Sequence, residues 1–358
     1  MKNHKNKVWR TLGLLSILLT LHLGSMNALA KEETKKGKYE IKWLLAHDPV
    51  SLFVEAANFF AREVEKRTNG EINVSILTTQ DINLKDHNLT QVYNKKYKII
   101  SPDQVIQMLM NGDVEMTQTY TTSLGKYENK LWILDLPYLF RDHNHATKVL
   151  DGKIGEQLLA GLGKSNMKGL AFTYSGGFRI LPTNGREIRK MEDFKGLRVG
   201  TSGSPVAKAV FEKLGGLGVS MPLVKGHEMT KKGLIEGIET TYPRLYSMHQ
   251  NEVSKVMNDT KHSLFLTSIV VNQTFYKGLP QHLQKVVKEV AKEAAVLERN
   301  ISIEDGIKTK ERCKKDGFKV VELPVSEQQR IKKAVAPLHK KFKNIFDEKI
   351  ISEIESIN

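Results

Sequence analysis

The longest periodic segment of the sequence extends from Pro280 to Lys315. Its apolar residues recur at the spacing of one helix face, at Leu283, Val286, Val287, Val290, Ala291, Ala294, Leu297 and Ile301. A helix of about 35 residues far exceeds the usual globular length, so we expect it to bridge two lobes rather than pack within one. The apolar run Leu264–Val271, which precedes it, predicts a strand buried on both faces.

Strand patterns alternate with helix patterns in the first part of the chain. Tyr39–Ala46 predicts a strand, and the helix that follows ends at Asn69-Gly70, before a second strand at 71–77. Ser101-Pro102-Asp103-Gln104 has the N-cap, the proline and the capping-box residue of another helix, which precedes the strand Val114–Thr119. This alternation indicates sheets covered by helices on both faces, and therefore an α/β fold.

The N-terminus has the pattern of a secretory signal peptide. Four basic residues and no acid among residues 1–10 precede the apolar run Leu12–Leu23 and the small-residue site Ala28-Leu29-Ala30. The run is short for a membrane span, which needs about 20 residues, and no cysteine follows it that could carry a lipid anchor. We expect residues 1–30 to be removed and the remaining chain to be exported.

The exported chain is longer than the ~250–300 residues at which a single hydrophobic core stops growing, which predicts two lobes. We assign residues 31–176 and 266–305 to lobe I and residues 177–265 and 306–358 to lobe II. With these boundaries the chain crosses between the lobes more than once.

Charge and cysteine content exclude some functions. The net charge of +15 comes from lysines that spread along the chain and concentrate after Lys308. Because the chain is exported and these lysines do not alternate with aromatic residues, we interpret them as a solvated face and expect no nucleic-acid partner. Cys313 is the single cysteine, so there is no internal disulfide, and its lysine-rich helical surroundings favour an inert thiol over a catalytic one.

Two arginines lie in apolar surroundings. Arg198 is in a strand-like Leu-Arg-Val triplet, and Arg179 lies between Phe178 and Ile180. A buried guanidinium is costly unless it meets an anion, and two of them could converge on one carboxylate, whose geometry their planar forks match. The alternative is a pair of structural salt bridges, and the spacing alone does not exclude it.

Signals for catalysis are weak. His143-Asn144-His145 has no partner at metal-ligand spacing, so we interpret it as a solvated turn, and the sequence has no His-Glu-x-x-His or Gly-x-Ser-x-Gly motif. We predict no catalytic residue, no metal ligand and no cofactor. The polar segment Thr78–Ile100 is too long for an ordinary connection and is either a surface insertion or part of a cleft mouth.

A series of short segments runs through the chain from about Trp43 to Gly317: Phe60–Gly70, Asp135–Phe140, His145-Ala146, Val149–Gly152, Phe178-Arg179, Asp193–Val199, Glu236–Glu239, Tyr246–Met248, Val270–Asn272, Leu279-Pro280 and Leu283-Gln284. In this order they resemble the periplasmic solute-binding proteins of TRAP (tripartite ATP-independent periplasmic) transporters, of the dicarboxylate-binding DctP type. The resemblance implies two α/β lobes, a long helix that spans both, and a solute enclosed by hinge closure.

The resemblance also implies roles for single residues. Arg198 is expected to form the salt bridge to the solute carboxylate, Arg179 to assist it, and the residue after Glu239 to contact the solute. That residue is Thr240, whereas many relatives have asparagine there. The hydroxyls of Thr240 and Thr241 therefore replace an amide, which leaves the identity of the solute open.

Further cleft residues are expected at the ends of predicted strands, where ligands of open α/β sheets bind. Aromatic rings would cover the apolar part of the solute, while hydroxyl and amide groups would fix its orientation. Together with Arg198, Arg179 and Glu239, the predicted binding residues are Tyr120, Thr121, Tyr174, Phe178, Thr240, Tyr242 and Asn272.

The sequence thus predicts a non-enzymatic periplasmic receptor for a carboxylate-containing organic acid. The resemblance implies that it delivers the acid to TRAP transporter membrane subunits for secondary active uptake. Two alternatives stay open, namely a receptor that feeds a sensor kinase and an exported enzyme with an anion-binding cleft.

Overall fold

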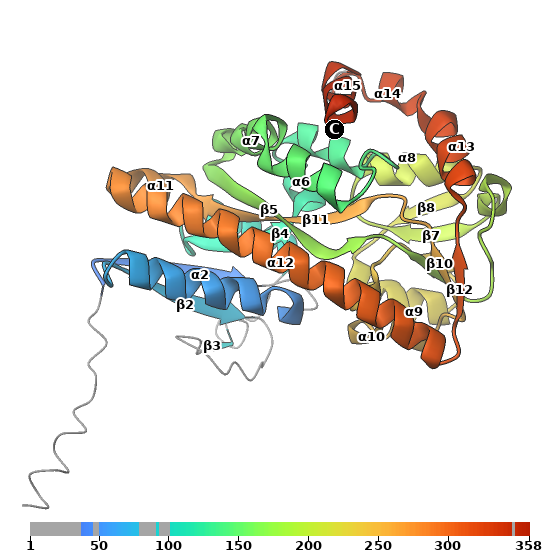
Figure 1. Cartoon of the computed structure of the whole chain (residues 1–358), viewed down its shortest axis with the longest axis horizontal. Helices are drawn as coiled ribbons and strands as arrows, with labels where there is room; N and C mark the ends of the chain where they lie inside the picture. The colour runs from blue at the N-terminus through green and yellow to red at the C-terminus, as the bar shows by residue number, and fades with distance from the viewer. Residues whose placement is uncertain (1–36, 46–49, 79–90, 93–100, 346–347) are drawn as a thin grey trace, which may run out of the picture. The chain divides into compact units, whose positions relative to one another are not determined.

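The computed structural model of the chain describes residues 37–45, 50–78, 91–92, 101–345 and 348–358 (Figure 1). In these residues the strands form two six-stranded sheets with helices packed against them. This mixed architecture confirms the predicted α/β class. The predicted signal peptide, 1–30, and most of the Thr78–Ile100 segment lie outside the described residues.

The first sheet has the order β3-β2-β1-β4-β11-β5. Its strands are β1 (Tyr39–Leu45), β2 (Ile72–Thr78), β3 (Gln91–Val92), β4 (Met116–Tyr120), β5 (Met167–Phe178) and β11 (Leu264–Asn272). Strand β1 pairs in parallel with β2 and β4, whereas β11 pairs antiparallel with β4 and β5. Every residue of β11 is buried, as predicted for the apolar run in this part of the sequence.

The second sheet has the order β12-β10-β6-β9-β7-β8. Its strands are β6 (Leu181–Thr183), β7 (Arg198–Thr201), β8 (Leu217–Ser220), β9 (Gly237–Ile238), β10 (Val256–Asp259) and β12 (Lys319–Glu322). Strand β7 pairs in parallel with β8 and β9. The sequence did not predict β8, β10 or β12, because strands this short carry too little periodicity. The lobe boundaries given above stay a prediction.

Helices connect the strands, with short 3₁₀ segments between some of them. The α-helices are α2 (Val54–Arg67), α4 (Pro102–Asn111), α5 (Thr121–Leu124), α6 (His143–Asp151), α7 (Lys153–Ala160), α8 (Pro205–Lys213), α9 (Gly226–Lys231), α10 (Tyr242–Ser247), α11 (Gln273–Gly278), α12 (Gln281–Lys315), α13 (Val325–Val335), α14 (Leu338–Lys341) and α15 (Glu348–Ser356).

Local signals begin and end α4 as predicted. The Ser101 hydroxyl accepts a hydrogen bond from the Gln104 N–H at 3.3 Å, and the Gln104 side chain accepts one from the Ser101 N–H at 2.8 Å. This capping box satisfies two backbone donors at the start of α4. Gly112 ends the helix with a φ of 83°, a conformation that glycine adopts without steric cost.

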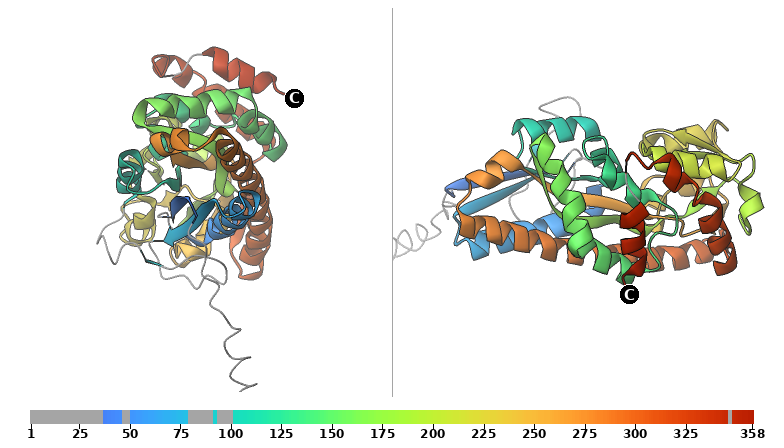
Figure 2. Two further views of the ribbon diagram at one scale, coloured as in Figure 1. Left: turned by 90° about the vertical axis from the view of Figure 1, so that its left-hand side faces the viewer. Right: turned by 90° about the horizontal axis from the view of Figure 1, so that it is seen from above.

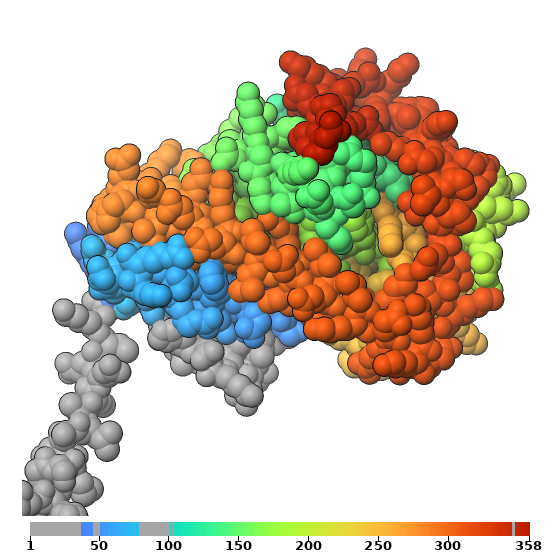
Figure 3. All heavy atoms as spheres, in the orientation of Figure 1, coloured from blue at the N-terminus to red at the C-terminus, as the bar shows by residue number. Residues whose placement is uncertain are grey.

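The long helix α12 contains 35 residues and confirms the predicted element. It contacts β5 of the first sheet and the helix α2, and it also contacts β12 of the second sheet and the helix α10 (Figures 1 and 2). The surface view shows α2 and α12 side by side (Figure 3), and Arg67 bridges them through an ion pair of 2.6 Å with Glu293. One element therefore connects the two sheets, as its length suggested.

A buried carboxyl fixes the middle of this helix to β5. Glu298 is 1% exposed, accepts the Tyr174 N–H at 2.6 Å and lies 2.8 Å from the Ser302 hydroxyl. Burial raises the pKa of Glu298 to about 8, against the lowering effect of these hydrogen bonds and of Arg299. Because desolvation outweighs these hydrogen bonds, the folded state is most stable when Glu298 is protonated.

This burial predicts a pH dependence of stability. The pKa of Glu298 is raised on folding, so its contribution is complete below the unfolded value near 4.5 and is lost as pH rises through about 8. Between pH 5 and pH 9 the wild type should lose more free energy of unfolding than Glu298→Gln, by on the order of 3 kcal/mol. Urea unfolding at both pH values measures the difference. The exposed Glu289→Gln on the same helix is the control, and equal losses in all three proteins would refute the assignment.

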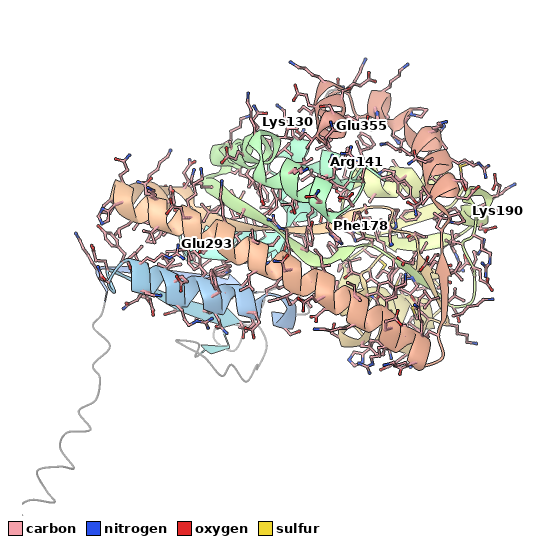
Figure 4. All side chains as sticks on the ribbon, in the orientation of Figure 1. Lys130, Arg141, Phe178, Lys190, Glu293 and Glu355 are labelled. Carbon is pink, nitrogen blue, oxygen red and sulfur yellow. The ribbon has the colours of Figure 1, made fainter. Side chains whose placement is uncertain are left out.

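The C-terminal helix α15 contacts the region of α6. Arg141 donates to the Glu355 carbonyl at 3.0 Å, and both residues are labelled in Figure 4. Lys148 donates to the Asn358 carbonyl at 2.6 Å, and His145 Nε2 lies 2.9 Å from the Ile354 carbonyl. His145 is 2% exposed, so the prediction of a solvated turn was wrong, because a helix far away in the sequence covers it.

Candidate functional site

A cavity of about 500 Å³ opens at the carboxyl ends of β4, β7 and β8. Parallel strands end together at such an edge, where open α/β sheets bind ligands. Both sheets contribute to its wall, since β4 and β11 belong to the first and β7 and β8 to the second. The lining residues are Ser101, Asp103, Tyr120, Thr122, Ser123, Lys126, Ser202, Gly203, Ser220, Met221, Pro222, Leu223, Val224 and Phe265.

Two buried guanidinium groups adjoin the aromatic wall of this cavity. The Arg179 Cζ lies 3.7 Å from the centroid of the Phe265 ring, and the Arg244 Cζ lies 5.0 Å from the same centroid. The Phe265 ring stacks on Tyr120 with centroids 5.1 Å apart. Both arginines are 1% exposed, and Arg244 donates to the Ser175 hydroxyl at 3.0 Å. The faces of these aromatic rings therefore stabilise the two positively charged guanidinium groups directly behind the cavity.

Glu239 links Arg179 to the cavity wall. Its Oε1 lies 3.7 Å from Arg179 Nη1 and accepts the backbone N–H of Ser202 at 2.7 Å. Its Oε2 lies 3.4 Å from His262 Nε2, and the other ring nitrogen of His262 lies 2.8 Å from the Thr260 hydroxyl. This network holds the carboxylate and the guanidinium in fixed positions at the end of β7.

Burial acts differently on the two carboxyl groups near Arg179. It raises the pKa of Asp135 to about 7, although the Arg179 charge and a hydrogen bond with Ser204 act in the opposite direction. Burial would also raise the pKa of Glu239, but the Arg179 charge and His262 hold that pKa well below its usual range. Glu239 is thus the ionised partner of Arg179 at neutral pH.

Several buried donors beside the cavity have no hydrogen-bond partner among the described residues. They are Arg179 Nη1 and the hydroxyls of Thr201, Ser202 and Thr240. Leaving a buried polar group unsatisfied costs about 1–3 kcal/mol. A cluster of such groups is typical of a site that a polar ligand completes.

The sequence matches the family model described as bacterial extracellular solute-binding protein, family 7, over residues 46–345. The chain belongs to this family. It is 25% identical over 300 residues, 84% of this chain and 81% of the relative, to the C4-dicarboxylate-binding protein DctB of Bacillus subtilis. The resemblance to the dicarboxylate-binding type is thereby confirmed.

Solved structures agree with this family. One is a TRAP periplasmic solute-binding protein from Ochrobactrum anthropi with its C-terminus bound in the ligand-binding pocket; the TM-score is 0.78 and the identity 27%, with 90% of this chain and 95% of that chain covered. Another, from a Polaromonas species, is bound to D-erythronate; the TM-score is 0.76 and the identity 26%, with 89% and 99% covered. This solute-binding protein has the two-lobed fold of these neighbours.

The structure brings four of the predicted binding residues together. Arg179 and Glu239 form the ion pair described above, and Tyr120 lines the cavity. Thr240 lies next to Arg179, because its backbone pairs with that of Ile180. Its hydroxyl is buried and has no partner among the described residues.

The burial of Arg198 differs from the prediction. Its side chain is 46% exposed and its Nε lies 3.8 Å from Glu236 Oε2, so it is not the buried guanidinium that the Leu-Arg-Val triplet suggested. Residues Leu197 and Val199 on either side are fully buried. Successive side chains of a strand point to opposite faces, so apolar neighbours in sequence do not bury the residue between them.

Three predicted aromatic residues do not line the cavity. The Tyr174 hydroxyl lies 3.5 Å from His143 Nδ1, and the Phe178 ring lies 4.8 Å from the His143 ring between centroids. Tyr242 belongs to a separate buried cluster with Met257. These residues were predicted from their position at strand ends, but β5 continues to Phe178, so Tyr174 lies within the strand.

Thr121 and Asn272 also have structural roles. The Thr121 hydroxyl lies 2.9 Å from the Ser268 hydroxyl and so links the start of α5 to β11. Asn272 caps α11 by accepting the Phe275 N–H at 2.8 Å and donates to the Leu109 carbonyl at 2.7 Å. Asn272 lies at the opposite end of β11 from Phe265, and therefore away from the cavity.

Replacing Asn272 tests this correction. Asn272→Ala removes the cap and one of the two donors to the Leu109 carbonyl, which keeps the Gly112 N–H, so the free energy of unfolding should fall by about 1–2 kcal/mol. The affinity for any organic acid that the wild type binds should stay within about 2-fold, because no step of binding uses this side chain. Chemical denaturation and calorimetric titration measure the two effects. A large loss of affinity with unchanged stability would restore Asn272 to the site.

Sequence reasoning missed several residues of the site. Ser202 and Gly203 follow directly after β7, and the position of a hydroxyl at the carboxyl end of a parallel strand is a usable signal. Arg244 lies in an apolar Tyr-Pro-Arg-Leu context that resembles the context of Arg179. Phe265 gave no signal, because it occurs inside a uniformly apolar strand.

Proposed function

We propose that this solute-binding protein takes up a carboxylate-containing organic acid in the cavity and delivers it, chemically unchanged, to TRAP transporter membrane subunits from the periplasm. The observation that carries the proposal is the buried Arg179, whose Nη1 has no hydrogen-bond partner among the described residues beside a cavity built by both sheets. The Bacillus subtilis relative and the Polaromonas neighbour are described as binding carboxylates, which supports the same chemistry.

Binding would use the groups already in place. A carboxylate that enters the cavity accepts charge-assisted hydrogen bonds from Arg179 Nη1 and a hydrogen bond from the Ser202 hydroxyl, which satisfies two orphaned donors at once. The rotation of the Phe265 ring sets how closely the carboxylate approaches the guanidinium, because this ring stacks on Arg179. Glu239 contacts both the Arg179 guanidinium and the Ser202 backbone N–H, and would keep the two in fixed positions while the solute binds.

The two sheets are expected to approach each other when the acid binds. Both contribute to the cavity wall, so a bound solute stabilises the closed arrangement by mass action, by about 2.7 kcal/mol at 100 times its dissociation constant. Solution scattering with and without an acid proven to bind would measure closure. An unchanged radius of gyration would contradict it.

Native mass spectrometry of protein purified under mild conditions tests the function. We expect a co-purified organic acid, which calorimetric titration should show to bind and which NMR should show to be unchanged after long incubation. Conversion of the acid into a product would favour the alternative of an exported enzyme. Failure of every carboxylate to bind would end the proposal.

A further inference from the structure

Resting on the proposed function, we propose that the solute is a monocarboxylate with an apolar body, rather than a dicarboxylate or a polyhydroxylated acid. Both the charges and the surface chemistry of the cavity support this class. The two features are independent of each other.

The charges of the cavity leave room for one carboxylate. Lys126 is the cation among the described lining residues, and it already forms an ion pair of 2.7 Å with Asp103, which also lines the cavity. Behind the wall, Arg179 and Arg244 contribute two positive charges, and Glu239, which lies 3.7 Å from Arg179 Nη1, contributes one negative charge. The net charge of these three groups is +1, which matches one solute carboxylate. A second carboxylate on the solute would therefore have to compete with Asp103 for Lys126 or remain desolvated without a counter-charge, and the second of these is costly.

The wall is mostly carbon. The segment after β8 contributes Met221, Pro222, Leu223 and Val224, and the first sheet contributes the rings of Tyr120 and Phe265. The serine and threonine hydroxyls of the lining residues are those of Ser101, Thr122, Ser123, Ser202 and Ser220. That of Ser101 is used in the capping box of α4, and that of Ser202 is assigned above to the solute carboxylate.

A polyhydroxylated acid would exchange water for this apolar surface, and each hydroxyl that faces the apolar part of the wall would be left without a partner. An apolar body gains from the same burial, at roughly 25 cal/mol per Å². The cavity therefore favours hydrocarbon beyond the single carboxylate.

Three acids with the same number of carbon atoms separate these classes. Hexanoate has one carboxylate and an apolar chain, adipate has two carboxylates, and D-gluconate has one carboxylate and a chain of hydroxyls. We expect calorimetric titration of the full mature protein, freed of any co-purified solute by unfolding and refolding, to give hexanoate an affinity at least tenfold above the other two. Equal or tighter binding of adipate or gluconate would overturn the proposal.

A matched pair of variants tests whether the apolar wall makes the difference. Val224 lines the cavity and is 51% exposed, whereas Leu217 is 49% exposed on β8 and does not line it. Val224→Asn should weaken hexanoate about fivefold and leave gluconate unchanged or slightly tighter, while Leu217→Asn should change neither. Because both side chains are half-exposed, both variants should fold. Equal effects of the two variants would contradict the proposal.

The outcome also separates this inference from the proposed function. If adipate or gluconate binds best, or if only a co-purified acid of another class binds, the protein is still a receptor for organic acids and only the solute class is wrong. If no acid co-purifies and none of the three binds, both the function and the solute class fail.

Discussion

Arg179→Ala should abolish measurable binding of organic acids, with an affinity loss of about 10²- to 10³-fold or more. The guanidinium is 1% exposed, so its removal leaves a buried solute carboxylate without a counter-charge. The same change leaves Glu239 buried without its partner, so the free energy of unfolding should also fall by about 3–5 kcal/mol. Calorimetric titration and urea unfolding measure the two losses separately.

Two further variants separate binding from folding. Arg179→Met combined with Glu239→Gln removes both charges of the pair, so this double variant should regain much of the stability and still fail to bind. Arg198→Ala is the matched control, since its side chain is 46% exposed and pairs with Glu236 at the surface. It should keep both affinity and stability near wild type, as exposed ion pairs contribute about 0–1 kcal/mol. Loss of binding in Arg198→Ala alone would return the site to the position that the sequence first suggested.

Gly203→Phe should block the cavity without disturbing the fold. Gly203 lines the cavity, and a Cβ built on it would have no atom within 4 Å, so a ring attached there extends into the space the solute needs. We expect no detectable binding even of the best acid, with a melting temperature within about 2 °C of wild type. Thermal melts and titrations of the purified variant measure both.

Gly278→Phe is the control for this experiment. A Cβ at Gly278 also meets no atom within 4 Å, but this residue is at the end of α11 and does not line the cavity. It should bind like the wild type. If Gly203→Phe binds an acid with near-native affinity, the solute site lies elsewhere, whatever the effect of Arg179→Ala.

The sequence was most informative where short-range signals act. The capping box at Ser101, the left-handed end of α4 at Gly112 and the 35-residue α12 all follow from periodicity and from the conformational preferences of single residues. The α/β class followed from the alternation of these elements. Such signals are local, so no tertiary contact was needed to read them.

Only some of the residues predicted to bind the solute lie at the candidate site, and the two arginines show why. Arg179 and Arg198 both have apolar neighbours in sequence, yet one is 1% exposed and the other is 46% exposed in its side chain. The difference depends on which face of its strand each side chain occupies and on what covers that face. Phe265, almost ninety residues after Arg179 in the chain, stacks on one guanidinium, and nothing comparable covers the other among the described residues.

Sequence patterns were sufficient to predict α2, α4, α12, the fold class and the presence of arginines suited to an anion. The tertiary structure alone decided that Arg179, Glu239 and Ser202 meet beside the cavity, while Arg198 and Asn272 do not. Helix caps and periodicity depend on residues a few positions apart. Burial and charge pairing, in contrast, depend on chain segments that only the packing of the two sheets brings together. Because the energy of a charged group depends mainly on its burial and its charged partners, the sequence alone does not determine it.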